Sequence, residues 1–173
     1  MAFTDPKDGA MTFDDFLRAE LSALTRFSGA LAGDRHLAED ILSDALLKVA
    51  AQWRRISALD DPAAYVRRVV VTTYLSDRRK TQRRQTVPAA DVPSLERPGP
   101  DASAAVIARD EVTGLLAQLP GQQRAAIVLR YLLDETDEHI AQALGCSPGT
   151  VRSHLFHARA TLRLTASARA DKE

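Results

Sequence analysis

The sequence predicts an all-α protein with two small helical domains joined by a proline-rich linker. Apolar residues recur at helical spacing on both sides of the chain centre. Between them, "VPAADVPSLERPGPDA" (87–102) holds four prolines and a glycine, which neither helix nor sheet accommodates. The 173 residues are enough for two small domains. We expect domains over residues 10–86 and 104–167, with a flexible linker over 87–103.

The first domain is expected to begin with two amphipathic helices. Apolar residues from Phe13 to Phe27 follow helical spacing, and Gly33 with Asp34 breaks the pattern. A second helix is expected from about Leu37 to Trp53. Its inward face would carry Leu37, Ile41, Ala45 and Val49. Another face would carry Asp40, Asp44 and Lys48, which stand four residues apart.

The next helix is expected to begin at Asp61-Pro62, with Asp as N-cap and Pro in the first helical position. Val69–Thr73 is rich in β-branched residues and has strong β propensity. The cap and the uninterrupted run into "SDRRKTQRR" nevertheless favour a helix.

The second domain is expected to hold four helices. The first runs from Ala104 to Leu119, and Pro120-Gly121 ends it. The second covers Gln122 to Leu133. Thr136 would cap a short helix, "DEHIAQAL", which Gly145 ends. Ser147-Pro148 opens the last helix.

The spacing of Ala141, Gly145, Val151 and Leu155 is typical of a helix-turn-helix. The small Ala lets the helices approach, and Gly adopts the turn conformation that a Cβ resists. Val151 and Leu155 would pack on Ile140 and Leu144, and four residues would then point outward: Thr150, Arg152, Ser153 and His157. Such a helix reads bases in the major groove, while Arg159 and Arg163 suit phosphates. A plain helical hairpin is the alternative, but an acid-free basic helix favours DNA binding.

Charge is segregated along the chain although the net charge is zero. From Arg54 to Arg84 there are nine Lys and Arg against three acids, a balance of +6. From Thr12 to Ala50 there are four bases against seven acids, a balance of −3. From Pro148 to Ala170 there are four Arg and no acid. Separate surfaces for separate partners are therefore expected.

The sequence predicts neither an enzyme nor a cofactor site. We find no nucleophile–base pair, phosphate loop or metal cluster. His139, His154 and His157 do not share one helix face, and the lone Cys146 excludes an internal disulfide. The acidic N-terminus does not resemble a signal peptide, and no apolar run reaches membrane-spanning length. A cytoplasmic protein without membrane insertion is expected.

At this point the chain from Phe13 to Arg163 resembles a bacterial sigma factor of the extracytoplasmic-function (ECF) type. "GDRHLAEDILSDALLKVAAQW" and "DDPAAYVRRVVVTTYLSDRRKTQRR" resemble sigma region 2. "LAQLPGQQRAAIVLRYLLDETDEHIAQALGCSPGTVRSHLFHARATLR" resembles region 4. The resemblance implies binding to core RNA polymerase (β′ clamp helices and β flap) and to promoter DNA. An anti-sigma factor is a possible further partner.

The resemblance also implies roles for individual residues. Core polymerase binding falls on Glu39, Asp40 and Asp44. The melted −10 element falls on Asp61, Tyr65, Arg67, Arg68, Thr72, Ser76, Arg78 and Arg79, with Lys80, Arg83 and Arg84 as further phosphate contacts. The loop Ile56–Asp61 resembles one that captures a flipped base. The −35 element falls on Thr150, Arg152, Ser153, His157 and Arg159.

Three positions depart from the family pattern. Tyr65 stands where the family usually has Trp and Thr72 where it often has Asn, although Tyr still stacks on an unpaired base. His139 replaces a usual Glu. The segment "DETDEH" (134–139) is more acidic than a DNA-facing surface, and we expect it to face polymerase or an anti-sigma protein.

Two alternatives share the fold. A sigma-mimicking adaptor would sequester an anti-sigma factor without touching DNA, but the +6 segment and the Arg-bearing last helix disfavour it. A simple helix-turn-helix repressor would leave the acidic helix and the basic 54–84 segment without a role.

Overall fold

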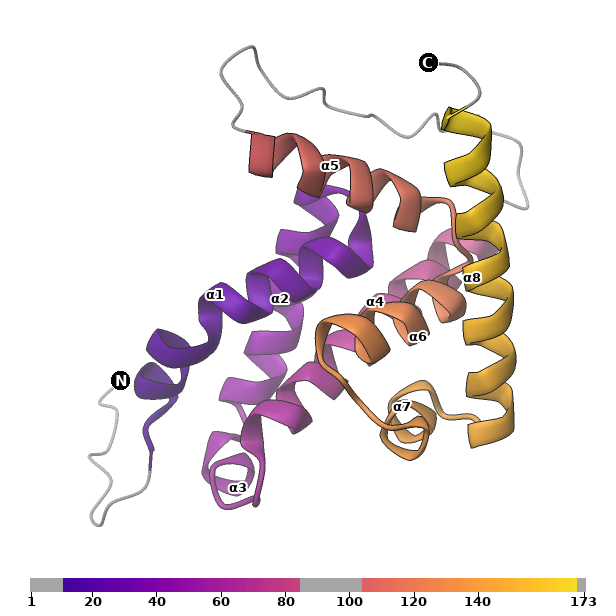
Figure 1. The fold of residues 1–173 in the computed structure, drawn as a ribbon. Coiled ribbons are helices and arrows are strands. Elements are labelled where there is room, and N and C mark those ends of the chain that lie inside the picture. Colours follow the sequence, from indigo (N-terminus) through magenta and orange to yellow (C-terminus); the bar gives the residue numbers. More distant parts are fainter. Residues whose placement is uncertain (1–10, 85–103, 171–173) are drawn as a thin grey trace.

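The structure is a computed structural model that describes residues 11–84 and 104–170. Across these ranges the regular structure is entirely helical, which confirms the predicted fold class (Figure 1). The predicted linker lies outside the described residues. The helices are α1 Phe13–Ala32, α2 Arg35–Ala50, α3 Trp53–Ile56, α4 Pro62–Arg84, α5 Ala104–Ala117, α6 Gly121–Leu132, α7 Asp137–Leu144 and α8 Pro148–Ala170.

Side-chain caps define where the first two helices begin, and a glycine defines where the first one ends. Thr12 Oγ1 accepts a hydrogen bond from the Asp15 amide at the start of α1. The helix runs five residues past Phe27 and ends at Gly33, whose φ of 75° is left-handed. Asp34 then caps α2 by accepting a hydrogen bond from the Leu37 amide at 2.8 Å. The predicted break at Gly33 and Asp34 is confirmed.

Helix α4 forms in spite of its β-branched run. Asp61 Oδ1 accepts a hydrogen bond from the Ala64 amide at 2.8 Å, so the predicted cap is present. Val66, Val70 and Val71 are fully buried. Burial of this apolar stripe against α1 and α2 outweighs the small helix penalty of β-branched residues.

Helices α1, α2 and α4 enclose the core of an N-terminal bundle, which we define as α1–α4. Ile41, Ala45 and Val49 are buried as predicted, but Leu37 is only half-buried. Ala38 and Leu42 are buried in its place. The short helix α3 was not predicted. It places Trp53 against Phe13 and Phe16, with Nε1 donating to the Met11 carbonyl oxygen.

Helices α5–α8 form a C-terminal bundle, in which α8 packs on α5, α6 and α7. Thr136 Oγ1 accepts from the His139 amide and Gly145 ends α7, as predicted. Leu119, Ile140, Val151 and Leu155 are among its buried residues.

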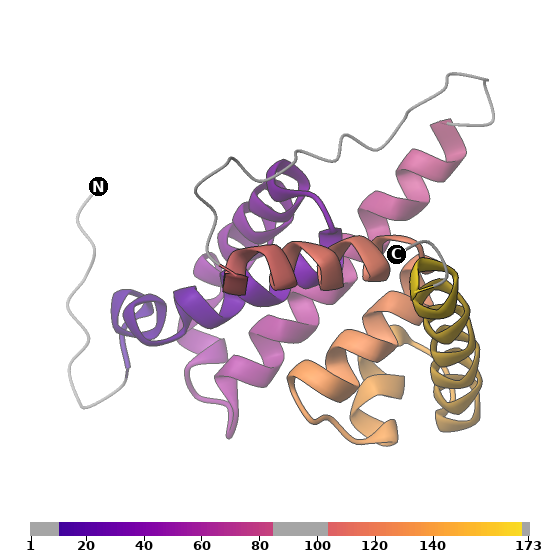
Figure 2. The same cartoon turned by 45° about the horizontal axis from the view of Figure 1, so that its top comes forward.

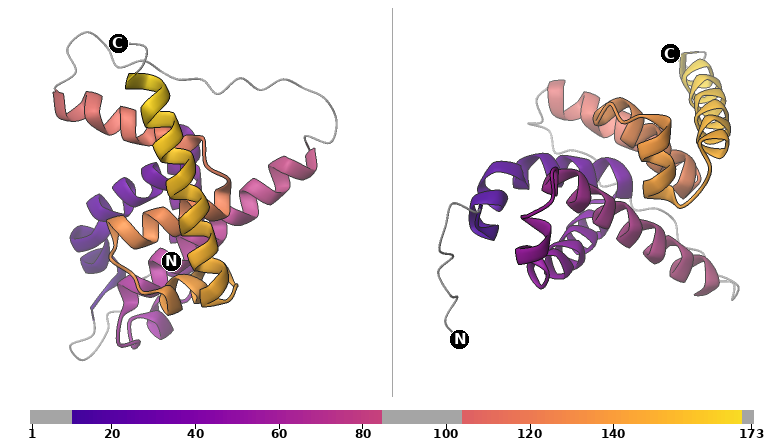
Figure 3. Two further views of the ribbon diagram at one scale, coloured as in Figure 1. Left: turned by 45° about the vertical axis from the view of Figure 1, so that its right-hand side comes forward. Right: turned by 90° about the horizontal axis from the view of Figure 1, so that it is seen from below.

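The two bundles pack against each other, which the sequence did not predict. Helix α6 contacts α1 and α4, and α7 contacts α4. Figure 2 shows α5 lying across the N-terminal bundle, and the view from below in Figure 3 shows the bundles side by side. A Cβ added at Gly33 would stand 3.2 Å from Ala117 Cβ, so glycine also permits this close approach.

Arg124 lies in the interface between the bundles and is 2% exposed. Its Nη1 donates to the carbonyl oxygens of Leu31 and Ala32, at the end of α1. Its Nη2 donates to those of Ala117 and Leu119, at and beyond the end of α5. Burial lowers the pKa of Arg124, because it disfavours the charged form. Carbonyl oxygens at helix C-termini carry partial negative charge, which offsets that desolvation.

Candidate nucleic-acid and polymerase interfaces

The helix-turn-helix has the predicted geometry. Gly145 adopts a φ of 66°, and its amide donates to the Ala141 carbonyl oxygen. Ile140 and Val151 are fully buried and Leu155 is nearly so, which confirms that α7 and α8 pack through these residues. The start of α8 is therefore held rigidly on the C-terminal bundle.

The outward face of α8 carries the residues predicted to read DNA. Thr150, Arg152, Ser153, His157 and Arg159 are all exposed. A helix turns about 100° per residue, so Ser153 lies at the centre of this face. Thr150 and His157 flank it on one side and Arg152 on the other. Arg159 is already engaged, because its Nε donates to the Tyr131 hydroxyl at 2.9 Å.

Phe156 belongs to the same surface and was missed from the sequence. It is 67% exposed at the middle of a basic helix, and its ring meets that of His157 edge-on. A large apolar side chain in this position is able to contact a thymine methyl group in the major groove. The detectable signal was an apolar residue outside the buried i, i+4 pattern of Val151 and Leu155.

Helix α2 presents the predicted acidic face. Glu39, Asp40 and Asp44 are exposed, and Glu39 accepts a hydrogen bond from Arg35 Nε at 2.9 Å. Leu47 extends the stripe of Asp40 and Asp44 by one helical turn and is 70% exposed. An exposed leucine beside carboxylates is typical of a protein-binding surface. Helical spacing predicts its place on the stripe, but its exposure needed the structure.

The residues predicted to bind the −10 element occupy two faces of α4. At about 100° per residue, five of them fall within an arc of about 80° and form a solvent-facing stripe, which comprises Tyr65, Arg68, Thr72, Ser76 and Arg79. Asp61 precedes the helix on the same side. Arg67 and Arg78 lie on the opposite face, toward the C-terminal bundle, where Arg78 approaches Gly121 of α6. The structure therefore does not bring the whole predicted set together.

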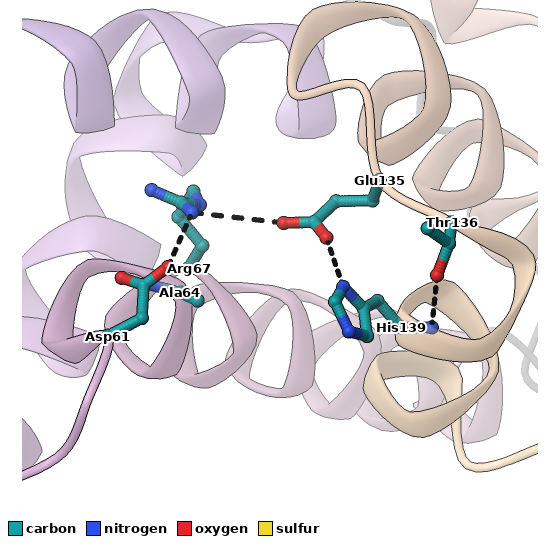
Figure 4. Close-up of polar contacts among 6 residues, drawn as sticks. All are labelled: Asp61, Ala64, Arg67, Glu135, Thr136 and His139. Atoms are coloured by element: carbon teal, nitrogen blue, oxygen red, sulfur yellow. Dashed lines mark hydrogen bonds and ion pairs between the residues drawn. The ribbon is translucent and has the colours of Figure 1, made fainter.

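The acidic segment 134–139 pairs with arginines of its own chain. Glu135 Oε1 lies 3.7 Å from Arg67 Nη2, and Glu135 Oε2 lies 2.9 Å from His139 Nδ1 (Figure 4). Asp137 contacts Arg130 and lies 3.5 Å from Arg152. Two carboxylates of the acidic segment, those of Glu135 and Asp137, thus face arginines that were predicted to bind DNA, Arg67 in one bundle and Arg152 in the other.

Burial shifts the pKa of two side chains near the turn. Burial raises the pKa of the Cys146 thiol, so it stays protonated and weakly nucleophilic at neutral pH. Burial, and secondarily the nearby His157, lower the pKa of His154, which makes its ring neutral at pH 7.

Over residues 11–84 and 104–170, no three His, Cys, Asp or Glu side chains are grouped to hold a metal ion. In the same ranges, no helix combines the length and apolarity needed to cross a bilayer.

Known proteins resemble this chain in sequence and in fold, and one family model matches its C-terminal bundle. Residues 109–162 match the family model "Sigma-70, region 4". This range covers α6, α7 and most of α8, including the helix-turn-helix and its outward face.

Relatives match over most of the chain. The RNA polymerase sigma-E factor of Streptomyces coelicolor is 33% identical over 153 residues, covering 88% of this chain and 85% of the relative. The ECF RNA polymerase sigma factor SigL of Mycobacterium tuberculosis is 32% identical over 149 residues, covering 83% and 82%. Both likenesses reach well beyond the C-terminal bundle, so they include the acidic helix and α4.

A solved structure agrees with the arrangement of helices. The sigma factor RpoE of Bartonella quintana, solved in complex with the anti-sigma factor NepR, superposes with a TM-score of 0.72 at 25% identity. The match covers 90% of this chain and 96% of that one. Fold, helix-turn-helix and relatives agree that the chain belongs to the ECF family of RNA polymerase sigma factors and acts in transcription initiation.

Proposed function

We propose that the chain binds core RNA polymerase through the exposed stripe of α2. Asp40 and Asp44 project from this helix with Leu47 beside them. A polymerase surface that fits would be basic around an apolar pocket, as the β′ clamp helices of the family's polymerase are expected to be. The carboxylates would steer the encounter, and the leucine would supply desolvated contact area. The joint presence of this stripe and a recognition helix in one chain carries the proposal.

The melted −10 strand is assigned to the solvent-facing stripe of α4. Tyr65 offers a ring on which an unpaired base stacks, which is worth about 1–3 kcal/mol per base in comparable sites. Arg68 and Arg79 supply charge for phosphates along the same stripe. Thr72 and Ser76 supply hydroxyl groups between them. Asp61 is the last residue of the loop 56–61, where a flipped base is expected to bind.

The −35 element is assigned to the outward face of α8. Arg152 is able to form a bidentate contact with guanine, and Phe156 is placed to contact a thymine methyl group. At about 100° per residue, Phe156 falls between Arg152 and Ser153, and Thr150 and His157 lie at the other edge of the face. Arg159 and Arg163 follow along the helix toward the phosphates.

An anti-sigma protein is the partner that we assign to the apolar groove formed by α5, α6 and α8, to which α1 adds one residue. Its lining includes Ala30 of α1, Val112 and Leu116 of α5, and Tyr131 and Leu132 of α6. Arg159 and Arg163 border it, so an amphipathic helix with acidic edges would fit. The Bartonella relative was solved with an anti-sigma factor, which supports this class of partner.

Titration of core RNA polymerase with the fluorescently labelled full chain tests polymerase binding. Asp40→Arg places a positive charge in the proposed interface, so we expect its affinity to fall by about 30-fold or more. Asp14→Arg, which makes the same charge change at an exposed position of α1, is the matched control and should bind like wild type. Equal affinities for all three proteins would refute the assignment to α2.

A further inference from the structure

Asp137 connects the helix-turn-helix to α6 through two arginines. It is the first residue of α7, and its Oδ1 contacts Nη2 of Arg130 in the last turn of α6. Its other oxygen, Oδ2, lies 3.5 Å from Nη1 of Arg152 on α8. The carboxylate therefore stands between an arginine of the scaffold and the arginine that we assign to base recognition.

The Asp137 carboxylate is held in place by its own bundle. The Asp137 side chain is 20% exposed and that of Arg130 is 28% exposed, so their attraction is screened less than between surface charges. The Thr136 hydroxyl caps α7 by accepting a hydrogen bond from the His139 amide, which orders the backbone on both sides of Asp137. A carboxylate in the first turn also interacts favourably with the helix dipole. Asp137 thus belongs to the rigid part of the motif.

Arg152 is the solvent-facing member of this cluster. Its side chain is 66% exposed, and a long side chain on a surface loses conformational freedom when it binds a partner. A Cβ added at Gly149 would stand 3.8 Å from Arg152 Nη2, so the guanidinium lies back over the first turn of α8. The first turn of a recognition helix is the part that reaches base edges. The ion pair with Asp137 therefore restrains the guanidinium at the end of α8 where base contacts are made.

The ion pair leaves Arg152 able to contact a base. A guanidinium carries five N–H donors in a planar fork, and Asp137 approaches the fork at Nη1. The opposite edge, formed by Nη2 and Nε, has the spacing that matches O6 and N7 of guanine. Arg152 can thus be held on one edge while the other edge contacts the base.

We propose that Asp137 is a positioning residue for recognition of the −35 element: it holds the Arg152 guanidinium in the orientation that meets a guanine edge, and Arg130 holds the carboxylate. This role rests on the proposed assignment of α8 to the −35 element, and it adds a determinant of base preference from α7.

The proposed role has two consequences of opposite sign. A carboxylate close to DNA repels phosphates, so Asp137 lowers the affinity for every sequence. By fixing Arg152 it raises the discrimination between sequences, because base contacts carry specificity and phosphate contacts do not. A purely electrostatic role would produce the first effect without the second.

Selection by the full chain from DNA duplexes with a randomised segment measures base preference. The position that Arg152 contacts is the one whose guanine preference is abolished by Arg152→Ala. Titration of the selected duplex, and of the same duplex with that G·C pair changed to A·T, then gives a discrimination ratio. Asp137→Asn removes the charge and keeps the shape of the side chain. Glu138→Gln removes the same charge from the neighbouring exposed residue and is the matched control.

We expect Asp137→Asn to lower the discrimination ratio by about three- to tenfold, which corresponds to the freedom of one long side chain, and to raise the affinity for the A·T duplex. Glu138→Gln should raise both affinities alike and leave the ratio unchanged. In an Arg152→Ala background, Asp137→Asn should not change the ratio, because the residue through which it acts is gone. Arg130→Gln, which loosens the carboxylate without altering α7 or α8, should also lower the ratio.

An unchanged or higher ratio in Asp137→Asn would overturn the positioning role. An equal loss of discrimination in Glu138→Gln, or in the Arg152→Ala background, would overturn it as well. A uniform loss of affinity for both duplexes, with a lower midpoint of urea unfolding, would assign Asp137 to stability alone and also overturn it. A wild type that selects no base, or an Arg152→Ala variant that keeps every preference, would instead contradict the assignment of α8 on which the role rests.

Discussion

The guanidinium of Arg124 meets no carboxylate in the described part of the chain; its charge is balanced by main-chain oxygens at the ends of two helices. Only arginine presents a planar fork of donors that reaches four such oxygens, so lysine is a poor substitute. In the sequence, Arg124 is simply one residue of "LAQLPGQQR", which opens the segment that resembles region 4. Its burial could not be predicted, because two of the four carbonyl oxygens that it contacts, those of Leu31 and Ala32, lie 93 and 92 residues earlier in the chain.

The outward placement of the α8 residues that we assign to DNA was easier to predict. Val151 and Leu155 fix which way α8 faces, and the exposure of Thr150, Arg152, Ser153 and His157 follows from helical geometry. The division of α4 into two faces follows from the same geometry. Arg67 and Arg78 still resembled DNA contacts, because the sequence does not show that a second bundle covers their face.

Two arginines of α8 should respond differently to removal. Arg152→Ala should cost about 1–3 kcal/mol of −35 affinity and relax specificity at one base pair, since it removes a base contact. Arg163→Ala should weaken binding to all sequences alike and lower the salt slope by about 1, since it removes a phosphate contact. Titration of matched and mutated −35 duplexes at several salt concentrations measures both effects. Identical behaviour of the two variants would contradict the assignment of Arg152.

At the scale of elements, local signals decide most of the structure. The Asp61 cap and Pro62 predicted a helix where propensity alone favours a strand, and burial of Val66, Val70 and Val71 supplies the missing stability. Helix ends without such signals were less predictable. Helix α1 continues to Ala32 because Gly33 is its first strong stop, and α3 is too short to leave a periodic pattern.

Glycines in two backbone conformations should give stability changes of opposite sign. A Cβ at Gly145 would meet no atom within 4 Å, so Gly145→Ala acts through its φ of 66° alone and should destabilise by about 1 kcal/mol. Gly114 lies inside α5 with equally open space, so Gly114→Ala should stabilise by about 0.5–1 kcal/mol. Urea unfolding followed by circular dichroism measures both. A stabilising Gly145→Ala would contradict the turn geometry.

For the whole molecule, composition and periodicity predicted two helical units but not their contact. Charge segregation along the chain indicated separate partner surfaces. In the structure, the acidic segment 12–50 forms α1 and α2, and the basic segments 54–84 and 148–170 include α4 and α8. The acidic segment 134–139 was expected to face another protein. In the structure Glu135 and Asp137 instead face Arg67, Arg130 and Arg152 of the same chain. Contacts between distant segments depend on how complete surfaces fit, and a linear pattern does not encode them locally.

In the proposed function, polymerase, the −10 element and the −35 element bind three separate surfaces of the sigma factor. Polymerase binding through α2 and DNA binding through α4 and α8 must then occur together. The assignment of α2 to polymerase predicts that Asp40→Arg loses transcription activity, while the matched control Asp14→Arg keeps it.

Run-off transcription of fragmented host genomic DNA by core RNA polymerase, with and without the purified chain, tests the central claim most directly. We expect new discrete transcripts whose upstream sequences share −35 and −10 elements, retained with Asp14→Arg and absent with Asp40→Arg. If the wild type yields no new transcripts although it binds core polymerase, promoter-directed initiation by this chain is contradicted.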